Sequence, residues 1–166
     1  AAAVAPEVPV PQAASKGKYP STPHLPFSPG VNPDDSRLAD CGHLLREEVL
    51  VTEKLDGGNC CIKGGQVFAR THAKPATHES FSAVKQLATG FGDALDGVEL
   101  FGENMQAVHS IEYGNLTSFF YVFAARRRGQ WLAWDEVAAL AEGLGLPTAP
   151  VVFQGHFDSL EHLQSS

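Results

Sequence analysis

Two glycine pairs divide the middle of the chain into three short runs with the character of β-strands. The runs cover residues 49–53, 59–63 and 66–70, and Gly57-Gly58 and Gly64-Gly65 separate them. Short runs rich in apolar side chains predict strands, and a Gly-Gly pair between two of them predicts a tight hairpin turn. The sequence therefore predicts antiparallel strands here, with the residues around position 54 forming the connection just before the hairpin.

The rest of the chain adds helices and further strands. Apolar residues recurring every three or four positions predict helices over residues 80–87 and 135–143. Apolar runs predict four more strands, over residues 98–103, 119–125, 130–132 and 150–153. The run 119–125 is apolar on both faces, which predicts a central strand covered on each side. Because strands outnumber helices and neighbouring strands are often hairpins, we predict an α+β domain with largely antiparallel sheets.

Composition bounds what this domain can be. A chain of 166 residues that is 43% hydrophobic can bury the core of one domain but not of two. The net charge of −7 argues against a broad basic surface for nucleic acid, so any such contact must be local. Cys41, Cys60 and Cys61 form no Cys-x-x-Cys pair, and we interpret them as small apolar residues of an intracellular, reducing compartment. No apolar run reaches the roughly 18 residues of a membrane span.

The N-terminal region has two parts of different character. Residues 1–17 are rich in Ala and Pro, and we expect them to be a disordered linker or the remnant of an organelle-targeting segment. Residues 18–40 are also interrupted by prolines but carry Tyr19, Leu25 and Phe27, which a free linker has little reason to keep. We expect this second part to lie extended against the domain.

A lysine stands between two acids directly after the first predicted strand. Lys54 follows Glu53 and precedes Asp56 and Gly57, giving the pattern Lys-x-Asp-Gly. A lysine amine that has lost its proton is a covalent nucleophile, and a desolvating pocket or a neighbouring cation favours that loss. The plainer interpretation is a strand that ends in a glycine-rich turn with solvated charges. The four-residue pattern alone does not choose between them.

Four segments in order give the pattern more meaning: Lys54-Leu55-Asp56-Gly57, Ala69-Arg70-Thr71-His72, Leu100-Phe101-Gly102-Glu103-Asn104 and Tyr121-Val122-Phe123. Their order resembles the ATP-dependent RNA ligases related to the bacteriophage T4 RNA-repair ligase, within the covalent nucleotidyltransferases. The resemblance covers about residues 18–157. It includes Lys18 to Pro26, Ala107 to Tyr113, Trp134 to Glu136 and Leu144 to Pro147.

The resemblance implies a role for each matched residue. Lys54 would attack the α-phosphate of ATP and form lysyl-AMP, Glu103 would hold the ribose, and Phe123 would stack on the adenine. Glu53 would lie by the base, Asn59 and Arg70 would lie near the nucleotide and its phosphates, and Leu55, Asp56 and Gly57 belong to the attachment motif. These residue types suit the ligand, because a purine binds flat aromatic faces, hydroxyls bind carboxylates and phosphates bind guanidinium groups.

Each matched residue also has an ordinary structural interpretation. Phe123 lies in a very apolar strand and would be a core residue in most proteins. Glu103 follows a glycine and would serve equally as a solvated charge at a strand end. Arg70 would serve as an edge-strand arginine. The sequence assigns no metal ligand.

The resemblance also implies a fold, cofactors and partners. We expect an antiparallel-sheet adenylation domain that uses ATP and Mg, acts as a monomer on RNA with 5′-phosphate and 3′-hydroxyl ends, and serves RNA repair. Residues 158–166 contain neither the Glu-Gly-x-Val nor the Lys-x-Lys motif of the superfamily. We therefore expect residues 18–166 to be the N-terminal part of that domain, incomplete at the C-terminus and inactive by itself. The alternatives are a non-catalytic nucleotide-binding remnant and a DNA ligase or capping-type nucleotidyltransferase.

Overall fold

The computed structural model describes residues 18–71, 73–106 and 110–165. Residues 1–17, expected to be disordered, lie outside the described residues. The described part of the chain contains β1 (Val49–Thr52), β2 (Gly58–Lys63), β3 (Gln66–Ala69), α1 (Ser82–Phe91), β4 (Val98–Asn104), β5 (Phe120–Arg127), β6 (Gln130–Trp131), α2 (Trp134–Gly143), β7 (Val151–Gly155) and α3 (Leu160–Ser165). Short 3-10 turns cover Gly42–Leu45, Glu79–Phe81 and Gly92–Leu95.

Five strands form one antiparallel sheet in the order β3-β2-β4-β5-β6. The predicted hairpin joins β2 to β3, with Lys63 opposite Gln66. Gly64 and Gly65 both have positive φ angles, +53° and +70°, as a two-residue hairpin turn that follows the twist of its strands requires. The glycine pair thus fixes the hairpin, as predicted.

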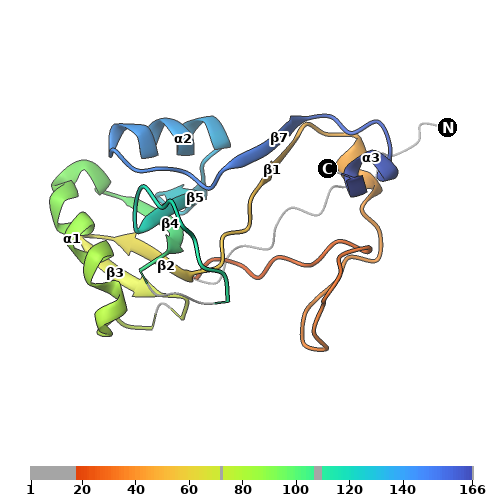
Figure 1. The fold of residues 1–166 in the computed structure, drawn as a ribbon. Helices are drawn as coiled ribbons and strands as arrows, with labels where there is room; N and C mark the ends of the chain where they lie inside the picture. The colour runs from red at the N-terminus through yellow and green to blue at the C-terminus, as the bar shows by residue number, and fades with distance from the viewer. Residues whose placement is uncertain (1–17, 72, 107–109, 166) are drawn as a thin grey trace.

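A second antiparallel pair joins the first and last strands of the chain. β1 pairs with β7 from Val49 opposite Gly155 to Thr52 opposite Val151. Figure 1 shows this pair leading away from the five-stranded sheet toward α3. The prediction of an α+β fold with antiparallel sheets is confirmed.

The main core lies between the five-stranded sheet and two helices. Val84 and Ala88 of α1 and Val137 and Ala141 of α2 pack on one face of the sheet. The strand residues in this core alternate along each strand, except across an irregularity in β5: Cys60, Ile62, Val67, Val98, Leu100, Phe120, Val122 and Ala125. Because side chains alternate along a strand, Cys61, Phe101 and Glu103 belong to the opposite face, which we call the second face.

The proline-punctuated N-terminal segment packs in a separate cluster. Leu25, Phe27 and Leu38 lie against Val49 and Val51 of β1 and against residues of the C-terminal region: Phe153, Phe157 and Leu163. The rings of Phe153 and Phe157 stack with centroids 4.3 Å apart. The expectation that residues 18–40 lie against the domain is confirmed for this part of the segment.

The element predictions are confirmed in part. The run 119–125, predicted to be a central strand covered on each side, corresponds to β5, an inner strand between β4 and the two-residue β6. The run 119–125 reads as apolar on both faces because one face packs on the helices and the other meets an aromatic group described below. Helix α1 begins at Ser82 and continues to Phe91, after a 3-10 turn that holds part of the predicted helix. Helix α3 was not predicted.

The cysteines behave as small core residues. All three are free and buried. Burial raises the pKa of Cys60, and it raises that of Cys61 to about 12, so these two thiols stay protonated at neutral pH. Among the described residues, no helix is both long enough and apolar enough to cross a bilayer.

Candidate functional site

Lys54 lies in the connection between β1 and β2, and the residues on either side of it are fixed. The Glu53 N–H donates to the carbonyl oxygen of Pro150 at 2.8 Å. Leu55 is only 7% exposed and packs with Met105 and Tyr121. Lys54 itself is exposed. The loop therefore presents one amine to solvent from a backbone anchored on both sides.

Asp56 ties this loop to the segment that follows β4. One carboxylate oxygen of Asp56 accepts the backbone N–H groups of Ser110 (2.8 Å) and Ile111 (3.1 Å) and also the Ser110 hydroxyl. In the other direction, the Asp56 N–H donates to the Tyr113 hydroxyl at 2.8 Å. The resemblance put Asp56 in the nucleotide site, and its contacts give it a bracing role in the loop.

Gly57 must be glycine because the end of β4 passes too close for a side chain. A Cβ atom at this position would lie 2.5 Å from the Asn104 carbonyl oxygen and 2.8 Å from the Met105 sulfur. Without it, the Gly57 N–H reaches a Glu103 carboxylate oxygen at 3.1 Å. The glycine of the motif thus brings the Lys54 loop into contact with Glu103.

Asn59 and Glu103 face each other across β2 and β4. Directly opposite residues of an antiparallel pair point to the same face, so both belong to the second face. Arg70 follows β3 beside Asn59, since Cys60 pairs with Ala69, and it is exposed. The topology thus gathers these three predicted residues at one end of the sheet, next to the Lys54 loop.

The side-chain oxygen of Asn59 is buried, and no described residue donates a hydrogen bond to it. A buried acceptor without a donor costs about 1–3 kcal/mol. Such a group in a folded protein calls for an explanation, and one explanation is a donor supplied by a ligand.

Phe123 lies at a bulge in β5. Phe101 pairs with Ala124 while Gly102 pairs with Val122, so Phe123 is the extra residue between these two pairs. A bulge re-aims the side chain at that position. Phe123 is half-buried and lies outside the main core, contrary to the ordinary interpretation of its strand.

An aromatic group surrounds Phe123 on the second face. The Tyr19 ring lies with its centroid 5.0 Å from that of Phe123, 5.7 Å from Phe101 and 5.5 Å from Trp131. The Arg126 guanidinium lies 5.2 Å from the Trp131 centroid. Burial raises the pKa of the Tyr19 hydroxyl. A purine stacked on Phe123 would share that ring with Tyr19.

From the sequence, no role in the candidate site was assigned to Tyr19, Ser110 or Tyr113, although the resemblance covered all three. Each stood in a matched segment, which was the available signal. Their partners are far away in the sequence: the Tyr113 hydroxyl accepts a hydrogen bond from Asp56, which lies 57 positions earlier. Only the folded topology shows these contacts.

The opposite end of the same strands carries a charge network. Glu99 binds the Lys63 amine at 2.6 Å and also binds the buried Arg126. Burial alone would raise the pKa of Glu99, but its hydrogen bonds and ion pairs with Arg126 and Lys63 outweigh this and hold the pKa below its usual value. Arg126 belongs to a run of three arginines, of which only Arg127 and Arg128 are exposed.

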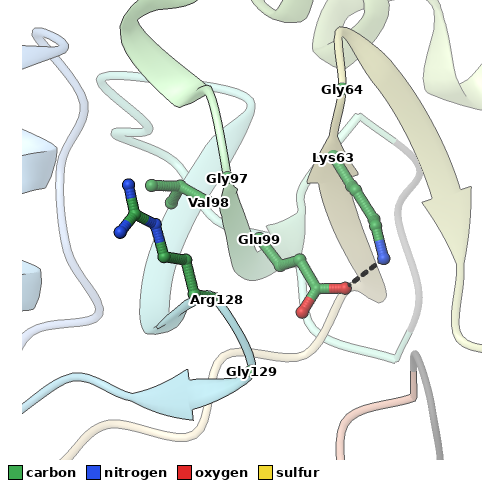
Figure 2. Close-up of a pocket in the computed structure, with 7 residues that line it drawn as sticks. All are labelled: Lys63, Gly64, Gly97, Val98, Glu99, Arg128 and Gly129. Atoms are coloured by element: carbon green, nitrogen blue, oxygen red, sulfur yellow. Dashed lines mark hydrogen bonds and ion pairs between the residues drawn. The ribbon is translucent and has the colours of Figure 1, made fainter.

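An open depression of about 310 Å³ lies beside this network. Figure 2 shows Lys63 bound to Glu99 there, while the Arg128 side chain extends away from that carboxylate. Lys63 lies four positions after Asn59 along β2, a distance of about 13 Å at a rise of about 3.3 Å per residue. The depression holds none of the predicted site residues. The described residues contain no group of three His, Cys, Asp or Glu side chains placed to hold a metal ion.

Comparison with known proteins agrees with this architecture. The sequence model of the RNA ligase family matches residues 47–165. A search of curated proteins finds no match. An archaeal ATP-dependent RNA ligase superposes with a TM-score of 0.53 and 22% identity, over 68% of this chain and 33% of that chain.

Two Naegleria gruberi structures are also similar. An RNA ligase with PPi has a TM-score of 0.56 and 18% identity, over 92% of this chain and 50% of that chain. An RNA ligase mutant with AMP and Mn has a TM-score of 0.52 and 18% identity, over 71% of this chain and 40% of that chain. At these identities the likeness shows the fold, and the chain spans between a third and a half of the solved proteins. Because the family match covers most of the sequence and the fold agrees with it, this chain belongs to the RNA ligase family.

Proposed function

We propose that this chain provides the adenylating site of an ATP-dependent RNA ligase, with Lys54 as the attacking amine. The observation that carries the proposal is the exposed Lys54 on a loop fixed on both sides and joined through Gly57 to Glu103. Fixed geometry at a nucleophile is what a group-transfer site requires, because it replaces random encounters by a positioned attack.

The proposed reaction begins at the Lys54 amine. After losing a proton, the amine attacks the α-phosphorus of ATP, so a nitrogen–phosphorus bond forms while the bond to pyrophosphate breaks and its electron pair leaves with pyrophosphate. An oxygen of an RNA 5′-phosphate then displaces the lysine and takes the AMP. A 3′-hydroxyl finally attacks this adenylated phosphate, joins the ends and releases AMP. Magnesium carried with the phosphates would neutralise their charge.

Other residues of the site would hold the nucleotide. We assign Phe123 to the adenine, Glu53 to the edge of the base and Glu103 to the ribose. The bulge that aims Phe123 out of the main core supports the first assignment. Glu103 has to accept the ribose hydroxyls while it also accepts the Gly57 N–H. A single carboxylate has enough lone pairs for both.

Asn59 and Arg70 are assigned to the nucleotide and its phosphates. The buried Asn59 oxygen would accept a hydrogen bond from a ligand donor, and Arg70 would supply a permanent positive charge at the rim. Leu55, Asp56 and Gly57 would act indirectly, because they fix the position of the loop and need not touch ATP.

Similar proteins support the substrate assignment. One Naegleria gruberi ligase was solved with AMP and another with PPi, the two products into which the first step divides ATP. The RNA substrate is inferred from the family.

The proposal is tested with ATP labelled at the α-phosphate. We expect the full-length protein to become labelled, and Lys54→Arg to remain unlabelled because guanidinium keeps its proton at any working pH. The matched control is Lys85→Arg, on helix α1 at the other face of the sheet, and it should label as the wild type does. A labelled Lys54→Arg protein would show that the nucleophile is another residue.

A further inference from the structure

We propose that Tyr113 and Ser110 are positioning residues, which aim Lys54 at the α-phosphate by acting on Asp56. The inference rests on the proposed adenylation by Lys54 and extends it to a segment about 55 residues away in the sequence. Neither residue need touch ATP.

The contacts between the two segments run in both directions. The Tyr113 hydroxyl accepts the Asp56 N–H, and the Asp56 carboxylate accepts two backbone N–H groups and the Ser110 hydroxyl. Hydrogen bonds to a carboxylate are about twice as strong as neutral ones. Four bonds therefore hold a residue that lies only two positions after Lys54.

The segment is itself fixed, so it can act as a reference for the loop. Tyr113 and Leu116 pack against the buried cluster of Leu55, Met105 and Tyr121. Leu55 thus enters the same cluster as Tyr113, and the loop is held there by side-chain packing as well as by hydrogen bonds.

The direction of the Lys54 side chain depends on this bracing. Lys54 is exposed, so packing of its own side chain fixes it little. Its backbone is set by Glu53 on one side and by Leu55 and Asp56 on the other. A misplacement of about 1 Å at a reacting group can slow a reaction by about 100-fold.

Two tyrosines of one cluster provide a matched pair for the test. Both hydroxyls accept a backbone N–H, that of Asp56 at 2.8 Å for Tyr113 and that of Thr117 at 3.0 Å for Tyr121. Replacing either with Phe removes one hydroxyl and leaves the ring. Only Tyr113→Phe cuts a bond to the Lys54 loop.

The experiment measures single-turnover adenylation of the full-length protein across ATP concentrations. We expect Tyr113→Phe to lower the maximal rate about 10-fold, with the half-saturating ATP concentration and the pH midpoint of the rate unchanged. Tyr121→Phe cuts two contacts with Thr117, so it should lower the melting temperature at least as much as Tyr113→Phe does but leave the rate unchanged. The inference would be overturned if neither variant slowed adenylation, or if both slowed it equally.

A second variant covers the case in which Tyr113→Phe folds poorly. Ser110→Ala keeps both rings and removes one donor to Asp56, and it should lower the maximal rate about fivefold, which corresponds to the loss of about 1 kcal/mol for one hydrogen bond. Ser110→Thr keeps the hydroxyl and should restore the rate. A wild-type rate for Ser110→Ala would overturn the inference. Failure of the wild-type protein to label Lys54 would instead refute the proposed function.

Discussion

Lys54 and Lys63 stand near opposite ends of β2, in contrasting surroundings. Lys63 is bound to Glu99, which also binds the buried Arg126. Within the described part of the chain no ion pair joins Lys54, although the backbone around it is firmly held. One end of the sheet thus pairs its charges within the protein, while the other presents an exposed amine and a buried oxygen without a donor among the described residues.

This difference between the two ends of the sheet bears on where a ligand would bind. Ion pairs that are complete within the protein contribute to the folded state and have little left to offer a ligand. Groups left without partners cost stability, and natural proteins keep such groups mainly at functional sites. We therefore place the proposed nucleotide site at the Asn59 end and not in the depression beside Glu99.

The largest expected effect concerns the charge network. Glu99→Gln leaves the buried Arg126 without a counter-charge, and we expect the free energy of unfolding to fall by about 3 kcal/mol. The adenylation rate of the folded protein should stay the same. Chemical denaturation and ATP labelling measure the two quantities. The control is Glu142→Gln on the exposed side of α2, and a loss as large in this variant would contradict the assignment.

The same network predicts a pH dependence. The folded-state pKa of Glu99 is lowered, so its contribution to stability is complete above the unfolded-state value of about 4.3. It is lost as the pH falls from there through the lower folded value. The stability difference between wild type and Glu99→Gln should therefore shrink below about pH 4. A difference that stays constant with pH would contradict the ion-pair account.

At the other end, Glu103→Ala should affect chemistry more than stability. We expect a loss of about 2 kcal/mol or more in transition-state stabilisation, which is roughly 30-fold in adenylation rate. The unfolding free energy should change by about 1 kcal/mol, for the lost bond to Gly57. Kinetic labelling and denaturation of the same samples separate the two. The structural alternative requires equal effects at Glu103 and Glu142.

The smallest expected effect concerns Asn59. In the absence of ATP, Asn59→Ala removes a buried oxygen that no described residue satisfies, so we expect unfolding stability to be unchanged or slightly higher. ATP binding should weaken by about 1 kcal/mol, roughly fivefold. Calorimetric titration and thermal unfolding test the pair of effects. Lower stability with unchanged ATP affinity would mean that Asn59 is a structural residue.

Much of the fold was predictable from local sequence patterns. Gly64 and Gly65 demanded positive φ angles and hence a hairpin, and alternation in β2 put Cys60 and Cys61 on opposite faces, as the structure shows. These features depend on neighbouring residues. The order of strands does not: apolar residues on both faces of β5 indicated an inner strand, but they do not reveal which strands pair with it or what covers each face.

The candidate site was predictable in part for the same reason. Lys54, Gly57 and Glu103 came from short motifs, and the structure brings them together. The contacts of Asp56 and Tyr19 could not be anticipated, because their partners lie far away in the chain and depend on its topology. The bulge at Phe123 likewise depends on the β4–β5 register, which alternation alone does not give.

The proposed function depends on Lys54 as the nucleophile. The most direct measurement is peptide mapping by mass spectrometry of the full-length protein after incubation with ATP and magnesium. We predict one AMP adduct, in an acid-labile bond to nitrogen, which fragmentation of the peptide localises to Lys54 and not to Lys63. An adduct on Lys63, or on any residue other than Lys54, would contradict the assignment of function to this end of the sheet.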